Sequence, residues 1–217
     1  MFELIQVKAE IKDKPGASDL TLKSAMVEFE DVSFDYERGR HILQGLSFKV
    51  PAGHKIAIVG PSGAGKSTIS RLLFRFYDTT SGIITVDGQN IQDVKQASLR
   101  AAIGIVPQDT VLFNDTIYYN IAYGRPHATR NQVEDAARLA HIHNFIIKLP
   151  KGYQTIVGER GLKLSGGERQ MLAISRALIS EPTFLMLDEP TAALSPRYQQ
   201  EIVANIDELR SDGISVL

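Results

Sequence analysis

The chain has 217 residues, of which 43% are hydrophobic, and its formal net charge at pH 7 is −1. This length suits one large domain, or one domain with a subdomain, and the hydrophobic fraction is ordinary for a globular core. A charge so close to zero gives no electrostatic reason to expect a nucleic-acid partner, and the lack of cysteine excludes disulfides, thiolate catalysis and cysteine-bound zinc.

Residues 1–24 form a lead-in before the first predicted strand. The stretch Lys12–Asp19 contains proline, glycine, serine and aspartate, a composition typical of turns and linkers. A flexible N-terminal tail is one interpretation of these residues. No stretch of the chain approaches the roughly 18 apolar residues that cross a bilayer, so action at a membrane would need another segment to bring the protein there.

Four short segments in the N-terminal half are predicted to be strands. Residues 26–34 and 46–50 alternate apolar and polar side chains, as half-exposed strands do. Residues 55–59 form a short apolar run, which predicts a buried parallel strand that leads into a glycine-rich loop. Residues 83–86 predict a further strand that closes in the turn Asp87–Gly88.

The glycine-rich loop Gly60–Ser67 fits the pattern G-x-x-x-x-G-K-S of a phosphate-binding P-loop. Its glycines let backbone N–H groups approach phosphate oxygens, Lys66 reaches the β- and γ-phosphates, and the Ser67 hydroxyl can bind Mg²⁺. The required context is present, because an apolar run precedes the loop and a helix is expected over residues 69–76. The predicted phosphate-binding residues are Gly60, Pro61, Ser62, Gly63, Ala64, Gly65, Lys66, Ser67 and Thr68.

The C-terminal half is predicted to be mostly helical. Thr129 suits the N-cap of a helix to about His141, and Ser165 precedes a helix to about Ile179. Residues 184–187 are apolar and predict another buried strand, and Ile214–Leu217 begins one more. Ser195–Pro196 is expected to open a last helix, whose inward side chains would be Ile202, Val203, Ile206 and Leu209.

A second glycine-rich turn, Leu164–Glu168, also opens a helix and so also directs N–H groups at an anion. Ser165 could cap this helix and donate to a γ-phosphate, with Gly166, Gly167 and Glu168 beside it. Capping alone does not explain two glycines, which lower helix propensity. Because a nucleotide has one terminal phosphate, either both loops converge within one chain or each serves a nucleotide shared by two chains.

Two carboxylates follow the predicted strand 184–187. They should emerge at the carboxyl end of that strand, where α/β sheets bind ligands. Asp188 suits the Mg²⁺ shell, and Glu189 suits a general base that polarises the attacking water.

These three motifs, in this order, resemble the nucleotide-binding domain of ABC transporters over residues 25–217. The resemblance implies an α/β fold: a P-loop NTPase (RecA-like) core with an antiparallel β subdomain and an inserted α-helical subdomain at about residues 98–170. It also implies a head-to-tail dimer of two such domains, with two ATP molecules and their Mg²⁺ ions between the subunits.

The resemblance assigns further residues. Gln108 matches the glutamine that binds Mg²⁺ or the attacking water, and Tyr36 matches the aromatic residue that stacks on adenine, whereas Phe34 suits the core. Thr155–Gly161 resembles the exporter segment that contacts the transmembrane domain. Residues 1–24 resemble the linker from that domain, which is missing from this chain, so the expected location is the cytoplasmic face of a membrane.

Some segments indicate a subgroup of the family, and other positions differ from the residues that the family usually has. Residues 106–117 and 120–124 look like mitochondrial and heavy-metal-tolerance exporters of glutathione- or iron–sulfur-linked substrates, whereas 188–191 is more typical of importers. The family usually has aspartate where Ser195 stands and arginine where Met171 stands. Its switch histidine lies beyond Leu217, so the chain is expected to be C-terminally truncated and weakly active.

The leading hypothesis is therefore the ATP-hydrolysing engine of an ABC exporter. One alternative is a fragment that binds ATP without turning it over. Another is a soluble ABC-type ATPase that acts on DNA or ribosomes, although such proteins usually carry coiled coils and basic surfaces. A simple P-loop kinase would explain the first motif but not Leu164–Glu168.

Overall fold

The computed structural model describes residues 11–37, 39–61, 63–161, 163–191, 196–211 and 214–217. The chain divides into two compact units, residues 1–51 with 58–100 and residues 52–57 with 101–217. The predicted phosphate contact of Ser62 and the departure at Ser195, including its expected helix cap, lie outside the described residues.

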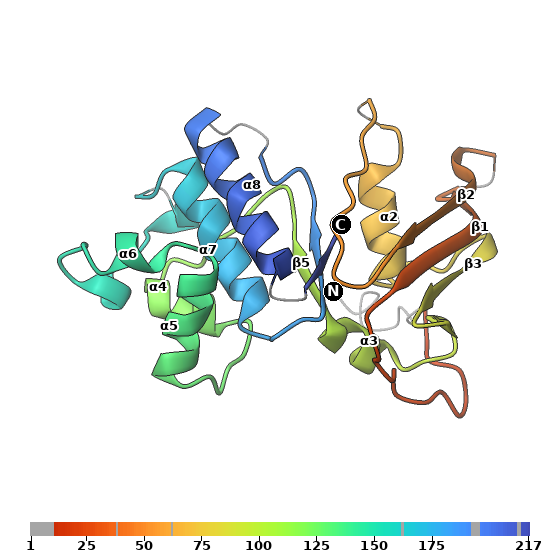
Figure 1. Cartoon of the computed structure of the whole chain (residues 1–217), viewed down its shortest axis with the longest axis horizontal. Coiled ribbons are helices and arrows are strands. Elements are labelled where there is room, and N and C mark those ends of the chain that lie inside the picture. The colour runs from red at the N-terminus through yellow and green to blue at the C-terminus, as the bar shows by residue number, and fades with distance from the viewer. Residues whose placement is uncertain (1–10, 38, 62, 162, 192–195, 212–213) are drawn as a thin grey trace, which may run out of the picture. The chain divides into compact units, whose positions relative to one another are not determined.

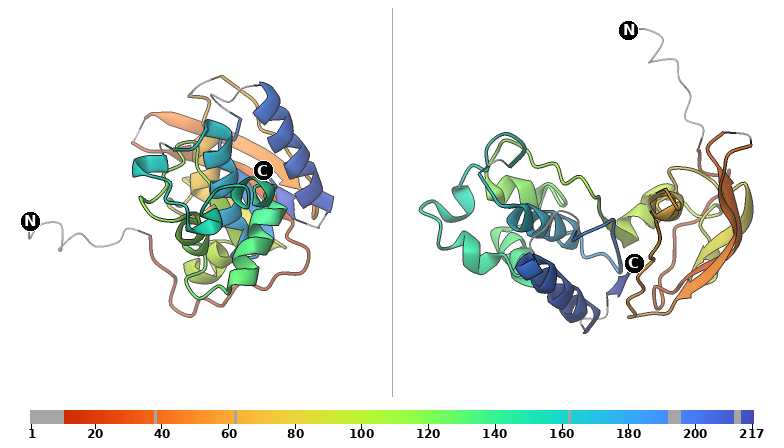
Figure 2. Two further views of the ribbon diagram at one scale, coloured as in Figure 1. Left: turned by 90° about the vertical axis from the view of Figure 1, so that its left-hand side faces the viewer. Right: turned by 90° about the horizontal axis from the view of Figure 1, so that it is seen from above.

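The first unit is built on an antiparallel sheet in the order β2-β1-β3-β4 (Figure 1). Its strands are β1 (Val27–Asp35), β2 (His41–Val50), β3 (Ser81–Val86) and β4 (Gln89–Asn90). In β1 the side chains of Val27, Phe29, Val32 and Phe34 are buried. The alternation changes phase between Phe29 and Val32, where the register shifts and Asp31 has a positive φ of 50°. Helix α2 (Lys66–Leu73) lies beside this sheet (Figure 2).

Asp87 fixes the lead-in of the chain to this sheet. It lies with Gly88 in the turn between β3 and β4, and both have positive φ angles of 50° and 75°. The Asp87 carboxylate accepts backbone N–H groups from four successive residues, at 2.7 to 3.0 Å, and the Ser24 hydroxyl at 2.7 Å. The four donors of these backbone bonds are Lys23, Ser24, Ala25 and Met26.

We expect Asp87→Ala to lower the free energy of unfolding by about 1–2 kcal/mol, because charge-assisted hydrogen bonds are lost. Burial raises the pKa of Asp87, but the bonds from Lys23 and Ser24 outweigh it and lower the pKa below the ordinary value. This stabilisation is therefore present above the unfolded pKa of about 3.9 and is lost as the pH falls further.

Denaturant unfolding at pH 7 and at successively lower pH checks this expectation, with Asp93→Ala as the control. The carboxylate of Asp93 makes a half-exposed ion pair with Lys14, which should contribute little. An Asp87→Ala loss equal to that of the control, or one that grows on acidification, would contradict the role assigned to Asp87.

The second unit combines a parallel sheet with helices (Figure 1). Strands β5 (Ile103–Val106), β6 (Phe184–Leu187) and β7 (Ser215–Val216) lie in the order β5-β6-β7. The helices are α3 (Gln96–Ala102), whose first five residues belong to the first unit, α4 (Ile117–Ala122), α5 (Arg130–Leu139), α6 (His143–Ile146), α7 (Gly166–Leu178) and α8 (Pro196–Ser211), with 3-10 turns at Gly152–Gln154 and Glu159–Gly161.

The core of this unit surrounds α7. Leu172 of α7 is fully buried, and so are Ile121 of α4 and Val133 of α5. The N-caps predicted at Thr129 and Ser165 are confirmed, because each begins a helix with a reciprocal pair of cap hydrogen bonds. No helix in the described part of the chain is both long enough and apolar enough to cross a membrane.

Residues 55–59 are not the predicted buried strand. Lys55 makes a bridge to Val216, and Ile56 N donates to Val216 O, but among the described residues no pairing continues past that point. Val59 is 88% exposed. An apolar run becomes a buried strand only where other strands flank it, and its partner β7 covers just two residues.

Two helix predictions need smaller corrections. The helix after the P-loop ends at Leu73 instead of Phe76, because Arg75 has a left-handed φ of 55° that a helix cannot continue through. Val203 is exposed, since the face of α8 that is buried at Ile202, Ile206 and Leu209 turns away from it.

The range 98–170, predicted as the helical subdomain, contains α4, α5, α6 and the start of α7. It also contains β5, which pairs with β6 in the parallel sheet. The boundaries of that subdomain stay a prediction.

Candidate functional site

The P-loop of the first unit leads directly into α2. Lys66 is the first residue of the helix, and its Nζ donates to the carbonyl oxygens of Gly60 at 3.0 Å and Pro61 at 3.1 Å. The lysine thus curls over the loop that precedes it. Its ammonium group is placed where a phosphate cradled by that loop would need a counter-charge.

Gly65 occupies the N-cap of α2 with a φ of 89°. A Cβ there would approach Leu43 Cδ2 to 2.8 Å, so the position requires glycine for conformation and for space. Glycine also has no side-chain oxygen to accept the first N–H groups of the helix. These donors and the positive end of the helix dipole therefore suit an anion.

Tyr36 of the first unit lies against α2. Its Oη is 3.3 Å from Thr68 Oγ1 and accepts a hydrogen bond from Arg71 Nη1 at 2.9 Å. The ring packs edge-on against Phe34 and Tyr77, with centroids 4.8 and 5.1 Å apart, and is 37% exposed. The structure thus brings the predicted adenine-stacking residue next to the predicted phosphate loop.

Sequence reasoning missed Arg71, although a signal was present. It stands three residues after Thr68, so both face the same side of α2. Arg71 holds the tyrosine from two directions, since its guanidinium carbon also lies 6.0 Å from the ring centroid.

Three predicted residues of the second unit meet at the carboxyl ends of β5 and β6. The register pairs Val106 with Leu187, so the residues that follow both strands emerge side by side. Gln108 Nε2 donates to Glu189 Oε2 at 3.0 Å, and Asp188 N donates to Val106 O at 3.0 Å.

The backbone at Glu189 has an unusual conformation. Its φ is 48°, in the left-handed region that non-glycine residues rarely adopt. Strain of this kind is concentrated at functional sites. It gives Glu189 an orientation that an extension of β6 would not provide.

The second glycine motif begins α7. Ser165 Oγ accepts Glu168 N at 3.3 Å, and Glu168 Oε2 accepts Ser165 N at 2.7 Å, which completes a capping box. Gly166 is the first helical residue. Capping therefore satisfies two backbone N–H groups, those of Ser165 and Glu168, which could otherwise bind an anion.

Gly167 has a packing reason as well. A Cβ at this position would collide with the ring of Tyr198, which α8 places against the start of α7. Ser165 Oγ also donates to Tyr198 Oη at 3.4 Å. Tyr198 was not singled out from the sequence, because no local pattern links it to a turn more than thirty residues away.

An aromatic patch, formed by Phe113, Tyr119 and Tyr123, lies on the surface of the second unit. These side chains are 38%, 44% and 53% exposed. Arg176 of α7 lies behind two of them, 5.4 Å from the Phe113 centroid and 6.0 Å from that of Tyr123. Contact with Arg176 therefore holds the rings of Phe113 and Tyr123 in place.

The predicted contact segment Thr155–Gly161 pairs with the start of α4, the helix that carries Tyr119 of the aromatic patch. Ile117 N donates to Thr155 O at 2.9 Å, and Thr116 bridges Ile156, which is 50% exposed. The sequence pointed to this segment but not to the patch or to Arg176.

A lysine-bearing glycine loop before a helix, together with a carboxylate pair and a glutamine at adjacent parallel strand ends, defines a nucleotide-binding domain of the P-loop class. The family model described as "ABC transporter" matches residues 43–192. The chain belongs to this family.

Two of the similar proteins are named as an exporter and a transporter. The chain is 57% identical over 216 residues to the "ATM1-type heavy metal exporter" of Novosphingobium aromaticivorans, covering 100% of this chain and 36% of that protein. It is 54% identical over 210 residues to the "Iron-sulfur clusters transporter atm1, mitochondrial" of Aspergillus fumigatus, covering 96% of this chain and 29% of that protein.

A solved structure agrees with these relatives. "Structure of a bacterial Atm1-family ABC exporter with ATP bound" superimposes with a TM-score of 0.91 at 56% identity, and the match covers 99% of this chain and 37% of that one. The predicted fold class and the resemblance to Atm1-type exporters are confirmed: the chain corresponds to the nucleotide-binding domain of these relatives. The chain spans only about a third of the length of these relatives.

Proposed function

We propose that this chain binds Mg-ATP and hydrolyses it to drive an exporter. The observation that carries the proposal is the P-loop geometry, with Lys66 folded over a glycine-capped helix start and Tyr36 held beside it. The bacterial Atm1-family relative, which is 56% identical, was solved with ATP bound.

Each predicted residue has a role that suits its chemistry. Tyr36 stacks on adenine, and Gly60–Thr68 binds the phosphates with backbone N–H groups and Lys66. Ser67, Gln108 and Asp188 offer hydroxyl, amide and carboxylate oxygens, the hard ligands that Mg²⁺ prefers. The ion would neutralise phosphate charge, while Glu189 accepts the proton of the attacking water.

Ser165–Glu168 is proposed to act on the nucleotide of a second copy of this domain, in a head-to-tail dimer. The Ser165 hydroxyl, which now donates to Tyr198, can turn to donate to a γ-phosphate without losing its cap to Glu168 N. This role would give a reason for a glycine-rich helix start beyond the packing of Gly167 against Tyr198.

The aromatic patch and Thr155–Gly161 are proposed to receive the transmembrane domain of the exporter, which places the chain at the cytoplasmic face of a membrane. Exposed fixed rings supply contact area at a low entropic cost. The relatives' names indicate heavy-metal or iron–sulfur-linked cargo, and the transmembrane domain would select it. No nucleic-acid partner is proposed.

The test is phosphate release from Mg-ATP at increasing concentrations of the chain. Because two copies would complete each site, we expect the rate per chain to rise with protein concentration before it reaches a plateau. Tight ATP binding with no release at any concentration would favour the alternative of a binding module without turnover. Failure to bind Mg-ATP would overturn the proposal.

A further inference from the structure

Residues 11–25, which we call the strap, are docked on the first unit. Lys95 N donates to Ser18 O at 2.8 Å, and Leu20 N donates to Ser98 Oγ at 2.9 Å. The bonds to Asp87 fix the end of the strap. A flexible tail is therefore wrong for residues 11–24.

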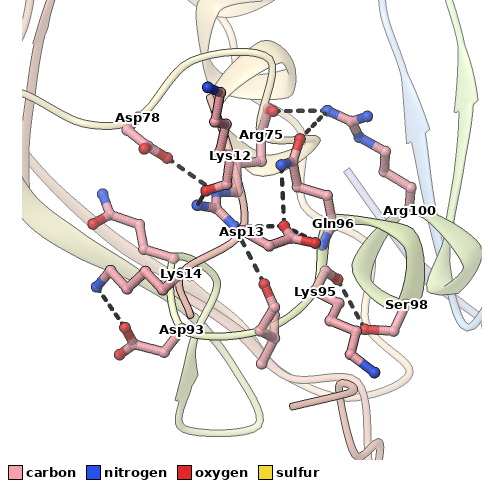
Figure 3. A network of polar contacts seen from close by, with 12 residues as sticks. Lys12, Asp13, Lys14, Arg75, Asp78, Asp93, Lys95, Gln96, Ser98 and Arg100 are labelled. Atoms are coloured by element: carbon pink, nitrogen blue, oxygen red, sulfur yellow. Dashed lines mark hydrogen bonds and ion pairs between the residues drawn. The ribbon is translucent and has the colours of Figure 1, made fainter. Parts of the chain in front are cut away.

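Asp13 of the strap caps α3. Its Oδ1 accepts both the backbone N and the side-chain Nε2 of Gln96, the first residue of that helix, at 3.0 Å each (Figure 3). The bonds from Gln96 lower the pKa of Asp13, which keeps the carboxylate charged. Asp13 therefore fixes both the start of α3 and the orientation of the Gln96 side chain.

Arg100 connects the side chain of Gln96 to the C-terminal end of α2. Its Nη2 donates to Gln96 Oε1 and to Arg75 O, both at 2.9 Å, and its Nε donates to Phe74 O at 3.1 Å. Phe74 is the C-cap of α2, so a cation satisfies carbonyl groups at the negative end of that helix.

Arg75, which follows the end of α2, contacts the strap itself (Figure 3). It is 1% exposed, donates to Lys12 O at 3.0 Å and to Val94 O at 3.2 Å, and lies 3.6 Å from Asp13. Its Nε also donates to Asp78 Oδ1 at 3.1 Å, and this bond and the one to Val94 O do not involve the strap. Release of the strap would remove Lys12 O and Asp13 from a buried guanidinium, and the loss of partners there is costly. Its left-handed φ leaves little freedom to readjust.

We propose that Asp13 is a positioning residue for nucleotide binding, which acts through Gln96, Arg100 and Arg75 on α2 and thereby on the P-loop. Helix α2 has eight residues and is about 12 Å long at about 1.5 Å per residue. A shift at its C-terminal end therefore moves Lys66 at its N-terminal end. The inference rests on the proposed function, since it assumes that the P-loop binds Mg-ATP.

Coupling of this kind is reciprocal: if the docked strap favours Mg-ATP, then Mg-ATP must favour the docked strap. A purely structural strap would not respond to nucleotide. The two directions can be measured separately on the 217-residue chain.

The first measurement is Mg-ATP affinity by calorimetry for Asp13→Ala, Asp13→Asn and Asp19→Ala. We expect Asp13→Ala to weaken binding about fivefold or more. Asp13→Asn keeps an oxygen that can accept from Gln96 and should recover much of the loss. Asp19→Ala removes the same charge from the same strap at an exposed pair with Lys95, and should bind as the wild type does.

The second measurement is hydrogen exchange at the amides of Lys95 and Gln96, which report strap docking. Saturating Mg-ATP should slow their exchange in the wild type and in Asp19→Ala, and less in Asp13→Ala. Thermal unfolding of each variant confirms that folded proteins are compared.

Equal Mg-ATP affinities for Asp13→Ala and Asp19→Ala would overturn the inference, and so would hydrogen exchange that does not change with Mg-ATP. Either result would leave the proposed function standing. An Asp13→Asn variant as impaired as Asp13→Ala would also count against the hydrogen-bond route. If the wild type fails to bind Mg-ATP, the proposed function falls and the inference falls with it.

Discussion

Lys66→Ala is expected to abolish nearly all Mg-ATP binding. The side chain is the point charge that this P-loop offers the β- and γ-phosphates, and its Nζ already reaches over the loop to Gly60 and Pro61. Two charge-assisted hydrogen bonds of about 1.5–3 kcal/mol each correspond to a loss of about a hundredfold or more in affinity. Calorimetric titration with Mg-ATP measures this loss of affinity.

Lys49→Ala is the matched control for this variant. It removes the same charge from β2 of the same unit, where Lys49 makes an exposed pair with Glu28 at 3.6 Å, and it should leave affinity unchanged. Both variants should unfold at similar temperatures. Near-normal affinity in Lys66→Ala would remove the P-loop interpretation.

The parts of the site that the sequence predicted depend on short-range chemistry. Gly65 and Lys66 stand at fixed spacing in a loop whose backbone conformation few residues can adopt. Likewise, Ser165 and Glu168 cap α7 through residues three apart, which any reading of the turn would find. Local patterns of this kind need no knowledge of the rest of the fold.

The parts that escaped prediction depend on partners far along the chain. Asp13 accepts a hydrogen bond from Gln96, which lies 83 residues further along the chain, and Tyr198 accepts one from Ser165, which lies 33 residues before it. Periodicity reports which face of an element is apolar but not which element will cover it. For the same reason the apolar run over residues 55–59 predicts a strand, although its pairing with Val216 stops at Ile56.

Glu189 is where the largest effect on turnover is expected. It lies at the carboxyl end of β6 in a left-handed conformation, with its Oε2 held 3.0 Å from Gln108 Nε2. A carboxylate can take a proton from water, whereas an amide cannot. Glutamine, however, has the same shape and an oxygen that can still accept from Gln108.

Glu189→Gln should therefore leave Mg-ATP affinity about intact and slow phosphate release about 10²–10⁴-fold, the usual contribution of a general base. Because bound ATP then persists, we expect the variant to accumulate as an ATP-dependent dimer in size-exclusion chromatography. Glu181→Gln is a demanding control, since Glu181 also has a positive φ, of 54°, and lies in an exposed pair with Arg125. The control makes the same chemical change under similar backbone strain, so it should hydrolyse ATP at the wild-type rate. If Glu189→Gln also retains wild-type turnover, Glu189 is not the base, and the proton must leave through another acceptor at the ends of β5 and β6.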